Sequence, residues 1–118
     1  MALRESLRQA GEVDQFGDLP MVVLSSSEMR RGGVFEEEAN RINKVILTLH
    51  AELAGLSTNS VHRIVAGAGH YIHWDKPEAV VTAVRDVLWA VRNREPFVAS
   101  YVNQEKALFV PNLALYYE

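Results

Sequence analysis

The sequence contains no cysteine, which excludes disulfide bonds, thiol catalysis and cysteine-ligated metal sites. It also has no apolar run near the roughly 18 residues that a membrane-spanning helix needs. Its first residues carry charges where a secretory signal would carry an apolar segment. These absences predict a soluble, cytoplasmic protein that does not enter a membrane.

Basic residues are too few and too scattered to form a surface for nucleic acids. The chain has 12 lysines and arginines against 15 aspartates and glutamates, which gives a net charge of -3. Gly32 and Gly33 are not followed by the Lys-Ser/Thr helix start of a phosphate-binding loop, so no cofactor is predicted. The 118 residues are 48% hydrophobic, which is enough for one domain with a core and too little for two.

The hydrophobic pattern predicts two strand-helix units. The apolar run Met21–Leu24 follows Pro20 and ends at three serines, as expected for a buried strand of a parallel sheet. Apolar spacings of three and four predict a helix from about 35 to 56, and "VHRIVAG" predicts a second strand. Short connections between these segments favour an α/β fold with a parallel sheet.

A second long helix is predicted after the second strand. Asp75 is interpreted as its N-cap, with Pro77 in the first turn and Glu78 at a capping-box spacing. Each long helix should bury one apolar stripe on the sheet. The first stripe comprises Ala39, Ile42, Val45, Ile46, Leu49 and Leu53, and the second comprises Val80, Val84, Val87, Leu88 and Val91.

The residues from 96 to 118 do not continue this pattern. They are rich in Val, Leu, Phe and Tyr around the polar stretch "VNQEK", which predicts a pair of extended segments or an arm instead of disorder. We therefore expect one α/β domain over residues 1–118, with a core at 17–92 and an extended apolar tail at 96–118.

Three segments together resemble the C-terminal part of an α/β-hydrolase: "GDLPMVVLSSS", "AELAGLSTNSVHRIV" and "GAGHYIHWDKPEAVVTAVRDVL". The most specific feature is "GAGHYIHWDKPEAV", in which a small residue, a glycine and a histidine precede a hydrophobic pair and a D/E-x-P-E/D helix start. In that family the catalytic histidine follows the last core strand, and the acid commonly follows the strand before it. The resemblance therefore implies that His70 is a catalytic base and that Glu28 lies near the position of the acid.

The sequence departs from that family in two respects. The family's usual turn holds a glycine and an aspartate where this chain reads "SSSE", so Glu28 is open to interpretation as an orienting acid or as a solvated loop residue. The chain also contains no G-x-S-x-G, the sharp turn that carries the nucleophile in these enzymes. A histidine without a nucleophile gives no acyl-enzyme chemistry. The resemblance thus implies a partial or truncated hydrolase that is inactive alone.

Other polar residues have simpler interpretations. Ser25–Ser27 lack the flanking glycines of a nucleophile turn and are interpreted as the polar end of a strand. His70 and His73 form an H-x-x-H spacing without a third ligand, so no metal site is predicted. His50 and His62 are interpreted as surface or helix-face residues.

Three functions remain open at this point. The chain could be a hydrolase portion that needs an N-terminal half from another polypeptide, a non-catalytic association module, or a domain that binds a small molecule at the strand ends. The partners expected are a second copy of the chain or the complementing half, because two strands alone are marginal in water. We expect a homodimer in which the sheets join or the helix faces pack together.

Overall fold

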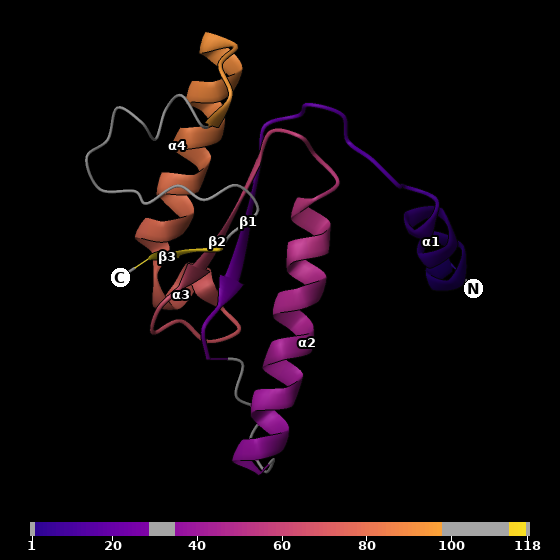
Figure 1. Cartoon of the computed structure of the whole chain (residues 1–118), viewed down its shortest axis with the longest axis vertical. Coiled ribbons are helices and arrows are strands. Elements are labelled where there is room, and N and C mark those ends of the chain that lie inside the picture. Colours follow the sequence, from indigo (N-terminus) through magenta and orange to yellow (C-terminus); the bar gives the residue numbers. More distant parts are fainter. Residues whose placement is uncertain (1, 29–34, 98–113, 118) are drawn as a thin grey trace.

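The computed structural model describes residues 2–28, 35–97 and 114–117. It shows an α/β fold around a small parallel sheet, as the sequence predicts (Figure 1). The strands are β1 (Met21–Ser26), β2 (Ser60–Val65) and β3 (Ala114–Tyr117), in the spatial order β1-β2-β3. Both strand pairs are parallel, with Met21 beside Ser60 and His62 beside Ala114. Strand β2 is therefore the central strand.

Two long helices lie on opposite faces of this sheet. Helix α2 (Glu36–Ala54) connects β1 to β2, and the short α3 (Ile72–Asp75) and the longer α4 (Pro77–Asn93) follow β2. His50 of α2 bonds Ser25 on one face, whereas Asp86 of α4 bonds Arg63 on the other. Successive residues of a strand point to opposite faces, so the two helices divide the side chains of β1 and β2 between them.

Strand β1 is two residues longer than predicted. The strand ends within the serines, as predicted, but after Ser26 and not after Leu24: Ser25 and Ser26 both belong to β1 and are 1% and 7% exposed. Their hydroxyls have partners: Ser25 bonds two histidines, and Ser26 donates to the carbonyl of Ala68. A buried hydroxyl is tolerated within a strand when it is hydrogen-bonded in this way.

The core lies mainly between the sheet and α4. One buried cluster joins Val61, Ala90 and Phe97, with Val22 and Val87 packed against it. A second cluster joins Val65, Ala68 and Ala79, with Leu24 and Ile72 packed against it. Helix α4 thus approaches the sheet through its alanines.

The predicted buried stripe of α4 is therefore only partly right. Val80 and Val87 are half-buried, but Val84, Leu88 and Val91 are 55%, 46% and 56% exposed. The residues that α4 buries instead are Ala79, Ala83 and Ala90. Valine and leucine residues lie on more than one side of α4. The small side chains of the alanines allow the closest approach of the helix backbone to the sheet.

The predicted stripe of α2 is also split. Ala39, Ile42 and Ile46 are half-buried toward the sheet, in line with His50 and the buried Ala54. Val45, Leu49 and Leu53, which the sequence places in the same stripe, are 54%, 55% and 43% exposed. The sheet is too narrow to cover both edges of the apolar face.

Asp75 does not cap α4, which corrects the sequence interpretation. It is the last residue of α3, and the N-cap of α4 is Lys76, which makes no side-chain cap hydrogen bond. Pro77 occupies the start of α4 as predicted. Its fixed φ and missing N–H suit the first turn of a helix.

The ends of the chain add two further elements. Helix α1 (Ala2–Gly11) buries no residue and stands apart from the sheet in Figure 1. Of the predicted tail, Phe97 is buried in the α4 cluster and 114–117 form β3, an extended segment as expected, while 98–113 lie outside the described residues. Among the described ranges, no helix has both the length and the apolar character needed to cross a membrane.

Candidate functional site

The carboxyl ends of β1 and β2 are fastened to each other. The N–H of Ser27 donates to the carbonyl of Val65 over 3.2 Å, and the N–H of Gly67 donates to the Ser27 hydroxyl over 3.0 Å. The Ser26 hydroxyl donates to the Ala68 carbonyl. Gly67 turns the chain with a φ of 71°, a conformation that favours glycine. Two serines thus fix the edge of the sheet where parallel strands bind ligands.

His70 stands exposed on the loop that these contacts hold. On one side the N–H of Glu28 donates to the carbonyl of Ala68 over 3.2 Å. On the other side the N–H of Gly69 donates to Oδ2 of Asp75 over 2.8 Å. A Cβ atom at position 69 would lie 3.2 Å from that carboxylate oxygen, so glycine leaves room for this contact. The backbone before His70 is held from both directions, and its imidazole faces solvent.

The structure brings the loops of Glu28 and His70 together through their backbones. No hydrogen bond or ion pair within the described ranges joins the Glu28 carboxylate to the His70 imidazole. Asp75 is the acid that contacts this loop directly, through the Gly69 N–H. Its role was missed because the "DKPE" stretch reads as a helix start, and only the single turn of α3 returns its carboxylate to Gly69.

The ring of Tyr71 lies against His70 on the surface, and the rings of His73 and Trp74 continue this cluster. The rings of His70 and Tyr71 lie edge to face with centroids 5.0 Å apart, and Tyr71 lies 5.2 Å from Trp74. His73 lies 5.6 Å from Trp74, and Tyr71 and Trp74 are 54% and 75% exposed. In the described part of the chain no three His, Asp or Glu side chains are grouped to hold a metal ion.

A second polar cluster was missed by the sequence analysis. The Ser25 hydroxyl lies 2.7 Å from Nδ1 of His50 and 2.6 Å from Nε2 of His62. The interpretation of both histidines as surface or helix-face residues is wrong for His62, which is 7% exposed, and incomplete for His50, which is half-buried. His50 lies four residues beyond Ile46 on the inward face of α2, and this spacing could have identified it.

This Ser25 cluster joins α2 to the sheet. The hydroxyl carries one proton, so it donates to one imidazole and accepts from a ring N–H of the other. Burial lowers the pKa of His62, and the nearby His50 lowers it further. Ser25 is 1% exposed, so a substrate in solution does not reach its hydroxyl. The cluster is therefore a structural cross-link and not a nucleophilic site.

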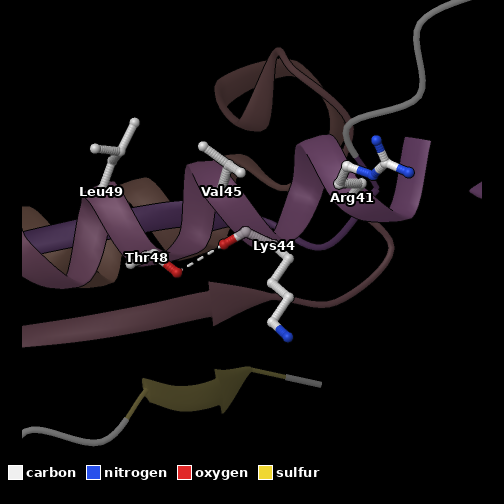
Figure 2. A pocket seen from close by; sticks show the side chains of 5 residues that line it. All are labelled: Arg41, Lys44, Val45, Thr48 and Leu49. Carbon is white, nitrogen blue, oxygen red and sulfur yellow. Dashed lines mark hydrogen bonds between the residues drawn. The ribbon is translucent and has the colours of Figure 1, made fainter. Parts of the chain in front are cut away.

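Helix α2 also borders a shallow pocket of about 280 Å³ on its outer surface (Figure 2). The pocket is lined by Arg41, Lys44, Val45, Thr48 and Leu49. Thr48 donates to the carbonyl of Lys44 over 2.8 Å, which uses its hydroxyl within the helix. Two cationic and two apolar side chains of a single helix hold no catalytic group, and the pocket contains none of the predicted site residues.

Comparisons of the chain with protein-family models, with curated proteins and with solved structures found no match.

Proposed function

We propose that this chain is the histidine-bearing portion of an α/β-hydrolase-like enzyme. It would act on carboxyl esters, epoxides or related acyl-type substrates, together with a polypeptide that supplies the nucleophile and the oxyanion donors. The observation that carries the proposal is the position of His70, which is exposed just beyond the carboxyl end of β2 on a loop bonded to the end of β1. Open parallel sheets bind their ligands at this edge.

In this proposal each residue of the loop has a separate role. His70 is the general base that takes the proton of the nucleophile. Glu28 is the orienting acid, because its exposed carboxylate belongs to the residue bonded to Ala68, two positions before His70. Asp75 positions the loop through Gly69. Ser26 and Ser27 are not proposed as nucleophiles, since their hydroxyls already bond the backbone between the strand ends.

The test compares His70→Ala with His73→Ala, since both histidines are exposed and only three positions apart. The isolated chain should hydrolyse p-nitrophenyl acetate no faster than its His70→Ala variant. Mixed with a G-x-S-x-G polypeptide encoded beside it in the genome, the chain should gain hydrolysis that His70→Ala abolishes. A general base contributes about 10²–10⁴-fold, and His73→Ala should leave the gain largely intact.

Two results would refute the proposal. The first is a reconstituted hydrolase whose activity is the same with His70→Ala as with the unchanged chain. The second is hydrolysis by the isolated chain that His70→Ala removes at equal folding, because the nucleophile would then lie within these 118 residues.

A second candidate function is a non-catalytic association module. The exposed apolar residues on the outer faces of α2 and α4 favour it, because single domains rarely leave such rows open to water. If the chain is an association module, mixing it with the G-x-S-x-G polypeptide should produce a stable complex without any gain in hydrolysis.

A further inference from the structure

We propose that the outer face of α4 is a self-complementary surface on which two copies of this chain pair antiparallel. Four exposed residues form this α4 stripe: Val81, Val84, Leu88 and Val91, which are 48%, 55%, 46% and 56% exposed. The stripe runs along the side of the helix away from the alanines that face the sheet. The inference is independent of the function proposed for His70.

The spacing of the α4 stripe fits a second helix. Its residues are separated by three, four and three positions, the alternating steps with which a helix lines up apolar residues along a partner helix. The row also has the same spacing when it is read from either end. An antiparallel copy therefore places Val81 against Val91 and Val84 against Leu88, so that one two-fold axis completes the contact.

Charged residues beside the α4 stripe select the antiparallel direction. Glu78, Arg85 and Arg92 are exposed and recur every seven residues along one edge of the stripe. In an antiparallel pair this edge meets the same edge of the second copy, so each Glu78 faces an Arg92 at the two ends of the contact, and the two Arg85 side chains, which repel each other, meet at its centre. A parallel pair would instead place the charged edge of one copy against the opposite edge of the second copy. That opposite edge carries the apolar Val80 and Val87.

The exposed row on α2 is the less suitable surface. Val45, Leu49 and Leu53 are separated by four residues at each step, and Figure 2 shows Val45 and Leu49 projecting from the same side of the helix. A helix has 3.6 residues per turn, so each four-residue step turns this row by about 40° in the same direction, whereas the alternating steps of the α4 stripe partly cancel. This row provides the matched control.

The experiment measures the mass of the full chain by size-exclusion chromatography with light scattering over a range of concentrations. The unchanged chain should approach twice its 13.2 kDa mass. Leu88→Glu should raise the dissociation constant about tenfold or more, whereas Leu49→Glu, at a similarly exposed leucine of α2, should leave it unchanged. Far-UV circular dichroism checks that both variants remain folded.

The charged residues beside the α4 stripe provide an independent test of the antiparallel arrangement. Glu78→Arg and Arg92→Glu should each weaken the dimer, and the double variant should restore it, because the reversed pair attracts again. A chain that stays at 13.2 kDa up to about 100 μM would overturn the proposal, as this exceeds the dissociation constant of ordinary specific dimers. A dimer that Leu49→Glu disrupts and Leu88→Glu does not, or charge variants without mutual rescue, would overturn it equally.

Discussion

Arg63 has a fully buried side chain, and its guanidinium forms an ion pair with an acid. Its Nη2 lies 2.5 Å from Oδ2 of Asp86, whose side chain is 25% exposed. The arginine projects from the central strand and the aspartate from α4, so the pair joins the helix to the sheet. A buried charge is tolerated when it is paired and becomes costly when its partner is removed.

We therefore expect Asp86→Ala to lower the free energy of unfolding by about 3 kcal/mol, measured by urea denaturation. The double variant Arg63→Met with Asp86→Ala should recover most of that loss, since it removes the charge together with its partner. A loss below about 1 kcal/mol in Asp86→Ala would show that the guanidinium does not need this acid.

His62 gives the stability of the chain a defined dependence on pH. Its pKa in the folded chain lies below the ordinary value near 6.5, because burial and the neighbouring His50 disfavour the charged form. Between these two values the unfolded chain binds more protons than the folded chain. Stability should therefore be complete above about pH 6.5 and fall as the pH drops toward the folded pKa.

Urea denaturation at several pH values tests this expectation. The contribution of one histidine has a slope no steeper than about 1.4 kcal/mol per pH unit. His62→Gln should flatten the profile in this window, whereas His73→Gln, at an exposed position on α3, should not. A nuclear magnetic resonance titration that placed the His62 pKa above 6.5 would contradict burial as the dominant influence on this imidazole.

At the scale of the element, α4 shows which side chains a helix needs to reach the sheet. Ala83 is 7% exposed and its neighbour Val84 is 55% exposed. We expect Ala83→Leu to cost about 1–3 kcal/mol of stability in urea, because the added carbons must displace packed atoms. At concentrations too low for self-association, Val84→Leu should change stability by less than about 0.5 kcal/mol. Equal effects at the two positions would mean that the helix faces are assigned wrongly.

The loop before His70 depends on the single turn of α3. Asp75→Ala removes the acceptor of the Gly69 N–H and should increase the motion of the amides at 69 and 70. Nuclear magnetic resonance relaxation should show order parameters that fall from about 0.85 toward 0.6 at these amides. Glu78→Ala, in the next helix, is the control. Unchanged order at position 69 in Asp75→Ala would remove Asp75 from the positioning of His70.

Periodicity predicted β1, β2, α2 and α4, but it did not predict α3 and did not identify all of the buried faces. The two predicted strands, the long helices and Pro77 at the start of α4 were predictable, because each depends on local spacing and backbone geometry. The buried side of α4 was not, since apolar residues cover more than one of its sides. A three-four spacing identifies an apolar side without showing whether the chain itself covers it.

At the scale of the whole molecule, the candidate site also combines features that the sequence predicts with features that depend on packing. The place of His70 beyond the second strand was predictable from the stretch around it, whereas its role as a base stays a prediction. The contact between Asp75 and Gly69 and the link from Ser25 to two histidines depend on how elements pack. Ser25 contacts His62 because the register of β1 and β2 places both side chains on the same face of the sheet. Helix α2, which covers that face, contributes His50.

The central position of β2 determines how its amide protons can exchange with solvent. Every residue from Val61 to Val65 is at most 7% exposed, and the strand has β1 and β3 at its edges and a helix over each face. Its amide protons have no local route to water, so they should exchange with deuterium only when the whole fold opens. Their exchange rate would then report the global stability of the chain, and α1, which buries nothing, should exchange long before them.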